Sequence, residues 1–229
     1  RLLQLEAGLN LKWLRRDKRV SVYKRELKFA TSRLSELPIY FCDTSALDIS
    51  EVRAEVNRFK RWHNIEYIIV DLVDDVSSSR FKDEMVNNQR AVMAGMKQIA
   101  KDFDIHVLLV SHVGKGNRET RESADLDVEE MIGSAAKYQD VDTAISIGPV
   151  KYNQMNELVA MQRDDIMWHV ANEGRLDVLI SITKNRHGEL DRFSLDLDFN
   201  KGGRFTETGW IKVVEEQAEL DMGDLTEYE

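Results

Sequence analysis

Two short apolar runs end abruptly at polar residues whose chemistry suits a phosphate site. The run 67–71 (YIIVD) ends in Asp71, and the run 107–112 (VLLVSH) ends in Ser111 and His112. Such runs are typical of parallel strands buried on both faces, whose carboxyl ends gather at one edge of a sheet. An aspartate at the end of a buried strand is how nucleotide-hydrolysing enzymes hold Mg²⁺. The two runs therefore predict an ATPase core with Asp71 and His112 side by side.

Simpler interpretations of these residues stay open. Asp71 could be a carboxylate that caps a strand end, and Ser111 with His112 could form a polar strand cap. Asp74 and Asp75 would suggest a two-metal nuclease. However, they fall in a serine-rich turn, where solvated carboxylates are ordinary, so the nuclease interpretation carries little weight.

Basic residues follow two of the expected strands. Lys184 and Arg186 alternate on an extended segment before Gly188, so both point the same way and could reach one phosphate cluster. Delivered from a neighbouring subunit, they would act as an arginine finger. A glycine-containing loop after His112 carries three bases that suit a nucleic-acid phosphate track, Lys115, Arg118 and Arg121. A solvated hairpin tip and a charged surface loop are the commoner explanations of these two patterns.

The main anchor for a triphosphate is absent from the sequence. No G-x-x-x-x-G-K-[ST] pattern occurs, and none of the 12 glycines lies in a phosphate-cradling arrangement before a helix. The segment 113–116 (VGKG) follows a strand but lacks the spacing and the Ser or Thr. Without the backbone N–H groups and the lysine of such a loop, this chain alone should bind ATP poorly or not at all.

Helices and strands alternate along the chain and would position these residues. Asp48 and Glu51 form an expected capping box for a helix that runs through Phe59. Other helices are expected before Gly8 and over 21–37, 82–102 and 128–138, and strands over 39–42, 67–71, 106–110, 142–147, 176–183 and 193–199. The alternation up to Ile147 predicts parallel βαβ units. The short Gly188 turn predicts that the last two strands are antiparallel.

Composition indicates a soluble globular protein. The 229 residues are 42% apolar and 32% charged, and no apolar run approaches the roughly 20 residues of a membrane helix. Cys42 is the only cysteine, which excludes an internal disulfide and fits a reducing compartment, so we expect a cytoplasmic protein without membrane contact.

The net charge of −9 is concentrated at the carboxyl end. Seven acids and no base occur from Glu215 onward, and the remaining 34 acids and 32 bases give −2. Overall charge therefore neither supports nor excludes DNA binding. We expect one partial domain over 1–209, with an insertion near 154–174, and a mobile acidic tail over 210–229.

The order of these segments resembles the carboxyl-terminal, RecA-like ATPase domain of DnaB-type replicative helicases, including the helicase half of phage primase-helicases. Six segments carry the resemblance: 1–8 is similar to the helix after the S-L-E-M motif, 34–44 to the L-x-x-x-P-[IL]-Y-[IF]-x-D-x strand, 68–71 to the Walker B strand, 110–112 to the phosphate-sensing strand end, 133–142 to the x-S-G-x-(I)-x-Q-x-x-D segment, and 184–188 to K-N-R-x-G. The sequence departs from the pattern at Ile132 (usually Arg), Ala135 (usually Gly) and Asp74 (usually Gln or Ser).

The resemblance implies an α/β, RecA-like P-loop-type three-layer fold, with a mainly parallel central sheet, antiparallel C-terminal strands and an incomplete amino-terminal part. The P-loop and the acidic residue of S-L-E-M would lie before Arg1. Asp71 would hold Mg²⁺ through water, and His112 would report the phosphate state. Lys184 and Arg186 would act on the ATP of the neighbouring subunit, and Gln139 belongs to the catalytic set.

The resemblance also implies partners. The intact enzyme would be a hexameric ring that unwinds DNA 5′ to 3′, with a primase or a helicase loader as further partners. Single-stranded DNA would pass through the centre, near four candidate phosphate ligands, Arg80, Lys115, Arg118 and Arg121. Two alternatives stay open: another RecA-like ATPase, of recombinase or signalling type, and a degenerate module that binds DNA or a partner without catalysis.

Overall fold

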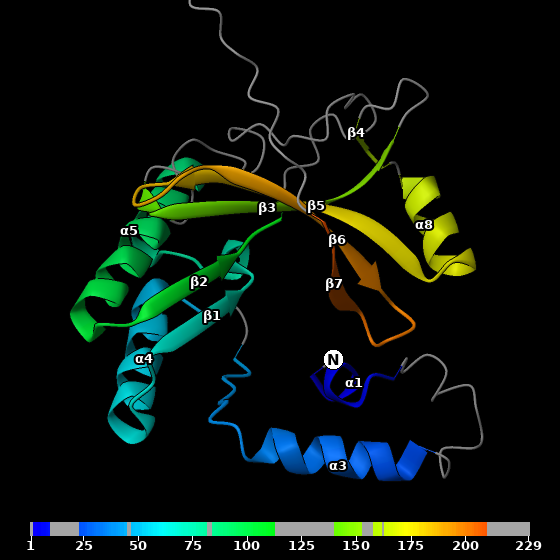
Figure 1. Ribbon diagram of the computed structural model, residues 1–229. Helices are drawn as coiled ribbons and strands as arrows, with labels where there is room; N and C mark the ends of the chain where they lie inside the picture. The colour runs from blue at the N-terminus through cyan, green and yellow to red at the C-terminus, as the bar shows by residue number, and fades with distance from the viewer. Residues whose placement is uncertain are drawn as a thin grey trace, which may run out of the picture.

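The computed structural model describes residues 2–9, 23–44, 47–81, 84–112, 140–152, 158–161 and 163–209. The strands are β1 (Tyr67–Asp71), β2 (His106–Val110), β3 (Thr143–Tyr152), β4 (Leu158–Ala160), β5 (Arg175–Asn185), β6 (Asp191–Asp198) and β7 (Arg204–Gly209). The helices are α1 (Leu2–Ala7), α3 (Lys24–Ser35), α4 (Ile49–His63), α5 (Met85–Phe103) and α8 (Arg163–Asn172), with short 3-10 turns η2 (Val73–Asp75) and η3 (Ser79–Phe81). Figure 1 shows α4 and α5 beside β1 and β2, α8 beyond β5, and α1 and α3 near β7.

The first core lies between α4, α5 and one face of the β1–β2 pair. On α5, Val92, Met96 and Ile99 are buried at the spacing of one helical face, and they pack with valines of α4. Ile68 of β1 and its neighbours on the inner face of the pair complete this cluster. Met85, expected on the same stripe of α5, is exposed at the start of the helix. The predicted long helix is otherwise confirmed.

The outer face of the β1–β2 pair is exposed, so the prediction of burial on both faces is wrong for the described residues. Ile69 is 68% exposed and Leu108 is 57% exposed, although both are apolar. Ile145 and Ile147 of β3 are also more than half exposed. The reason is that α4 and α5 cover only one face of the pair (Figure 1).

The strand expected over 142–147 does not continue the parallel sheet, which corrects the prediction of parallel pairing up to Ile147. β3 pairs antiparallel with β5 over 143–149 and with β4 over 150–152. Its alternating pattern identifies a strand but does not specify the neighbouring strand. β5 and β6 are antiparallel, as predicted. Within the described residues, the parallel part is the β1–β2 pair, and the antiparallel sheet β4-β3-β5-β6-β7 is larger than expected.

α1 is attached to the last strand of this sheet. The Arg204 guanidinium donates two hydrogen bonds to the Leu5 carbonyl, at 2.9 and 2.6 Å. Gly202 has a φ of +84°, and a Cβ there would lie 2.6 Å from the Gln4 carbonyl oxygen. Only glycine permits this close approach without strain. Arg204 thus satisfies a carbonyl at the end of α1 that has no partner inside the helix.

Residues 39–42 are extended but do not form the expected strand. The described residues place no strand beside this segment. Instead, Tyr40 stacks on His63 of α4, with 3.8 Å between ring centroids, and Phe41 is exposed. A β-prone sequence forms a strand only where another edge is available for pairing.

Some expectations fall outside the described residues, namely the helix over 128–138 and the acidic tail over 210–229. The domain limits at 209 and 210 therefore stay a prediction. The stretch 154–174, expected as an insertion, contains β4 and α8 in its described part. Across the described ranges, no helix has the length and apolar content needed to cross a membrane.

The predicted capping box at the start of α4 is confirmed. Asp48 Oδ1 accepts a hydrogen bond from the Ser50 backbone N–H at 2.9 Å, and Glu51 Oε2 accepts from the Asp48 N–H at 2.7 Å. Asp48 Oδ2 also accepts from the Ser79 N–H at 2.5 Å, so the same side chain holds the turn that follows β1. Hydrogen bonds, first from the Ser50 hydroxyl, lower the pKa of Asp48 to about 2.

Asp48→Ala should lower the free energy of unfolding by about 0.5–2 kcal/mol at pH 7, because α4 loses its cap. Since the folded pKa of Asp48 lies below the ordinary 3.8, the stabilisation by the carboxylate is present above pH 3.8 and is lost as the pH falls toward 2. Denaturant unfolding across this pH range measures the effect. Asp48→Asn is the control, since it keeps a cap without ionising. The same acid sensitivity in Asp48→Asn as in the wild type would contradict this origin.

Candidate active site

The carboxyl ends of β1 and β2 lie at one edge of the sheet, as predicted. The strands are parallel, and Asp71 lies opposite Val110 in the last register pair. Ser111 and His112 therefore begin where Asp71 ends the first strand. Asp71 and His112 are both exposed, so a phosphate and a hydrated cation can approach from solvent. A carboxylate can ligate Mg²⁺, and an imidazole can hydrogen-bond a phosphate oxygen.

Asp74 connects the two strand ends directly. Its Oδ2 accepts a hydrogen bond from Ser111 Oγ at 2.8 Å and from the His112 backbone N–H at 3.2 Å. Sequence reasoning assigned Asp74 to a solvated turn and missed these contacts, because the partners lie 37 and 38 positions further along the chain. The available signal was an acid at a position where the resembled family usually has Gln or Ser.

Lys184 and Arg186 lie in a second cluster, around Asp142. The Arg186 guanidinium is 3.5 Å from Asp142 Oδ1, and the Arg186 backbone N–H donates to the Asp142 carbonyl at 2.9 Å. Lys97 of α5 pairs with the other carboxylate oxygen, Oδ2. Lys184 lies opposite Ala144 at the start of β3, close to the same carboxylate. Three cations around one carboxylate leave an excess of positive charge that suits a phosphate.

Two pKa values in this cluster are shifted. The hydrogen bond from Lys97 is the largest influence lowering the pKa of Asp142, and the charge of Arg186 adds to it. Burial, followed by repulsion from Arg186, lowers the pKa of Lys184. Asp142 is therefore a carboxylate at neutral pH, and Lys184 loses its proton more easily than a free lysine does.

The structure does not bring the cations of this cluster to Asp71 of the same chain. Lys97 anchors the cluster to α5, and Figure 1 shows the turn between β5 and β6 beside α5. The arrowheads of β1 and β2, where Asp71 and His112 lie, point toward the other side. Each chain therefore presents two separate charged sites.

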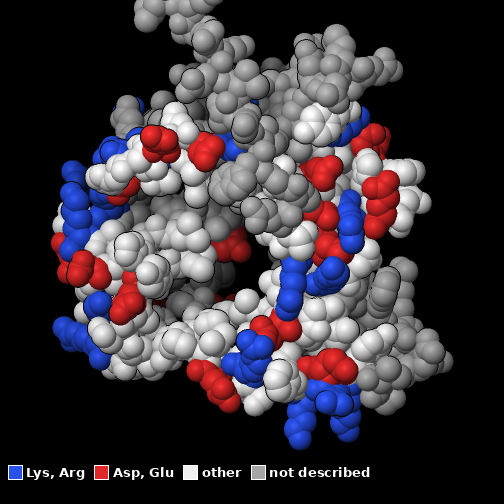
Figure 2. Space-filling view, viewed as in Figure 1, with Lys and Arg blue, Asp and Glu red and all other residues white. Residues whose placement is uncertain are grey.

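The remaining predicted residues are placed only in part. Arg80 is exposed in η3, and its guanidinium carbon lies 5.4 Å from the centroid of the Phe81 ring. Four others lie outside the described residues: Lys115, Arg118, Arg121 and Gln139. Figure 2 shows basic side chains mixed with acidic ones on the visible face, so this view offers no uniformly basic track.

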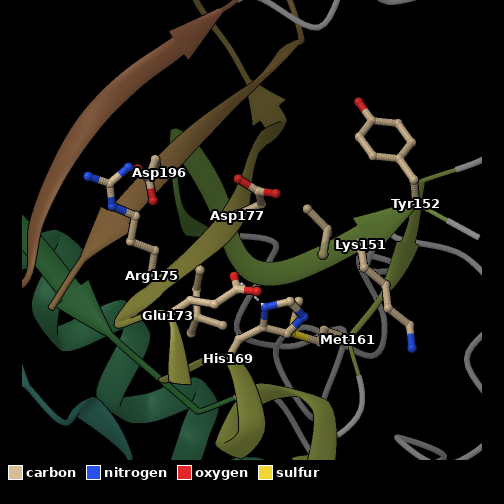
Figure 3. A pocket seen from close by; sticks show the side chains of 10 residues that line it. Lys151, Tyr152, Met161, His169, Glu173, Arg175, Asp177 and Asp196 are labelled. Atoms are coloured by element: carbon tan, nitrogen blue, oxygen red, sulfur yellow. Dashed lines mark hydrogen bonds and ion pairs between the residues drawn. The ribbon is translucent and has the colours of Figure 1, made fainter. Parts of the chain in front are cut away.

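A hollow of about 290 Å³ lies near the start of β5, at the opposite end of that strand from Lys184 (Figure 3). α8 contributes His169, whose Nδ1 is 2.9 Å from Glu173 Oε2. Burial, and then the nearby charge of Asp196, raises the pKa of Asp177 in the same hollow. No motif in the sequence pointed to these residues.

The chain matches the family model described as DnaB-like helicase C terminal domain over residues 1–207. It is 29% identical over 207 residues to the replicative DNA helicase DnaB of Rickettsia prowazekii (strain Madrid E), covering 89% of this chain and 42% of that protein. The replicative DNA helicase DnaC of Bacillus subtilis (strain 168) is 25% identical over 204 residues, which cover 88% of this chain and 41% of that protein. The chain thus spans less than half the length of these relatives.

Two solved structures share its fold. One is an isolated ATPase domain, which has a TM-score of 0.72 and 19% identity, covering 91% of this chain and 69% of that chain. The other is a DnaB-like replicative helicase, described together with its interactions with primase, which has a TM-score of 0.72 and 16% identity, covering 91% of this chain and 46% of that chain. At these identities the likeness concerns the fold alone, and the predicted RecA-like fold is confirmed.

Asp142→Asn should lower the pKa of Lys184 further, because the Asp142 charge favours the ammonium form. NMR titration of the Lys184 side chain in the 229-residue protein measures the change. Asp165→Asn, which removes the partner of Lys151, is the matched control and should leave the Lys184 titration unchanged. An unaltered Lys184 pKa in Asp142→Asn would show that the two groups are not coupled.

Proposed function

Because the chain belongs to the DnaB-like helicase C-terminal domain family, we propose that it is part of an ATP-dependent replicative helicase that unwinds DNA 5′ to 3′ as a hexameric ring. The observation that carries this proposal is the separation of the Asp71 edge from the Arg186 turn within one chain. Two charged sites on different sides of a subunit suit head-to-tail assembly, in which one site meets the other across each interface.

Asp71 is proposed to hold the Mg²⁺ that accompanies ATP. Within the described ranges, no group of three or more His, Cys, Asp or Glu side chains could hold a metal ion. A single carboxylate fits Mg²⁺, which keeps several waters and takes further ligands from substrate phosphates. Bound Mg²⁺ would neutralise charge on the phosphates during hydrolysis. His112, at the neighbouring strand end, would hydrogen-bond the terminal phosphate and so distinguish ATP from ADP.

Lys184 and Arg186 are proposed to act on the nucleotide of the adjacent subunit. The Arg186 guanidinium is 45% exposed, so it can leave Asp142 for a phosphate without breaking a buried contact. A planar guanidinium donates two parallel hydrogen bonds to phosphate oxygens. The excess of positive charge around Asp142 favours this exchange of partners.

The exposed outer face of β1 and β2 supports a further part of the proposal, that additional sequence completes the nucleotide site. Ile69 and Leu108 lie uncovered on this face, and Figure 2 shows a hollow in the centre of the molecule. Apolar patches of this kind in soluble proteins mark surfaces that another segment covers. A strand and helix carrying a P-loop would cover apolar surface and supply the missing triphosphate anchor.

Single-stranded DNA is the proposed second ligand. Arg80, exposed after the Asp71 strand, is the described candidate for a phosphate contact. The sequence adds three bases after His112 that lie outside the described residues: Lys115, Arg118 and Arg121. A primase or a helicase loader is the proposed protein partner, and one of the structurally similar helicases is described with its interactions with primase.

The 229-residue chain alone should bind ATP weakly even with Mg²⁺, because it contains no P-loop. Titration calorimetry up to about 1 mM ATP, a concentration that corresponds to about −4 kcal/mol of binding free energy, should show no saturable heat. The full-length Bacillus subtilis relative serves as the positive control. Tight ATP binding by the chain alone would contradict the proposal that the anchor lies in another segment.

Arg186→Ala in the full-length parent should reduce ATP hydrolysis by about 10³-fold or more while sparing nucleotide affinity, because the finger stabilises charge that develops during transfer. Steady-state hydrolysis and fluorescent-nucleotide binding measure the two effects. Arg192→Ala, on β6 of the same hairpin, is the control and should retain turnover. Unchanged turnover in Arg186→Ala would exclude the finger role. A full-length parent that neither hydrolyses ATP nor unwinds a 5′-tailed duplex would overturn the helicase proposal itself.

A further inference from the structure

Asp74 follows one of the two strand ends along the chain and contacts the other through its side chain. The β1–β2 register ends with Asp71 opposite Val110, so Ser111 and His112 extend beyond the last pair. There, Asp74 Oδ2 accepts from the Ser111 hydroxyl and from the His112 backbone N–H. One carboxylate oxygen therefore continues the connection between the strands for two residues past the sheet.

The turn that carries Asp74 is fixed on both sides. Val73 is buried in the core under α4 and α5, so the residue before Asp74 cannot move freely. After Asp74, the Ser77 N–H donates to the Leu47 carbonyl at 3.1 Å, and the Ser78 N–H donates to Asn88 Oδ1 at 2.8 Å. Asp74 is thus an acceptor mounted on a rigid turn, in the way that supporting groups hold a functional side chain.

We propose that Asp74 is a positioning residue, which sets the place of His112 relative to Asp71 by holding the His112 backbone. This inference rests on the proposed function, since it assumes that Mg²⁺ at Asp71 and a phosphate at His112 belong to one nucleotide. A carboxylate accepts charge-assisted hydrogen bonds, which are shorter and stronger than neutral ones. Misplacing a catalytic group by about 1 Å can slow a reaction by about 100-fold. Asp74 therefore acts through His112 and needs no contact with the nucleotide.

The geometry separates this role from general stabilisation. Among the described residues, the side-chain acceptor for Ser111 and His112 is Asp74 and not the adjacent exposed acid, Asp75, which therefore provides a matched control. Asp74→Asn keeps an acceptor oxygen of similar size, whereas Asp74→Ala removes it. If positioning is the role, the Asn variant should resemble the wild type, and only the Ala variant should lose function.

The first test uses the 229-residue protein and needs no nucleotide. Hydrogen exchange of the His112 amide should be about 10-fold faster or more in Asp74→Ala, because the amide loses its acceptor. The rate is expressed relative to that of the His106 amide, which donates to the Glu66 carbonyl at 2.8 Å, so general destabilisation raises both rates and cancels. Asp75→Ala should leave the ratio unchanged. An unchanged ratio in Asp74→Ala would overturn the proposed contact.

The second test uses the full-length parent. Asp74→Ala should lower kcat for ATP by about 10- to 100-fold with less than about a twofold change in KM, because positioning affects the reaction more than ground-state binding. Asp74→Asn should restore kcat to within about threefold of the wild type, and Asp75→Ala should match the wild type. A wild-type parent with no ATPase activity refutes the proposed function, whereas an active parent whose Asp74→Ala variant keeps its kcat refutes only the role of Asp74.

Discussion

Parallel pairing of β1 with β2, from Tyr67 opposite His106 to Asp71 opposite Val110, sets the position of each polar group at the Asp71 edge. A slip of one residue would turn the buried face of β1 away from α4 and α5 and expose it to water. Burial of that face therefore fixes the register. The register in turn determines that His112 emerges beside Asp71, so packing in the core and the chemistry at the edge depend on the same contacts.

The sequence predicted the features that depend on neighbouring residues. Asp48 and Glu51 lie within one helical turn, so the capping box could be recognised directly. The apolar stripe of α5 and the two runs that form β1 and β2 also have a local period. The polar strand ends were found for the same reason, since each directly follows an apolar run.

The features that the sequence did not predict depend on distant partners. Alternation in β3 shows which side chains share a face, but not that β5 lies alongside. The apolar run at Ile69 is compatible with one covered face or two, and only the packing of α4 and α5 distinguishes them. Asp74 looked like an ordinary turn acid because its donors follow β2. Arg186 could be proposed as a finger, but its attachment to Asp142 required the fold.

The hydrogen bonds from Arg204 to the end of α1 have a mechanical consequence. Tension applied through α1 would pass into β7 and then, across the antiparallel ladder, into β6 and β5, which carries the turn with Arg186. The β1–β2 pair is seated on a different core, under α4 and α5, and would not feel this load directly. Movement of any segment joined to α1 would therefore be levered toward the cationic turn while the magnesium-binding edge stays still.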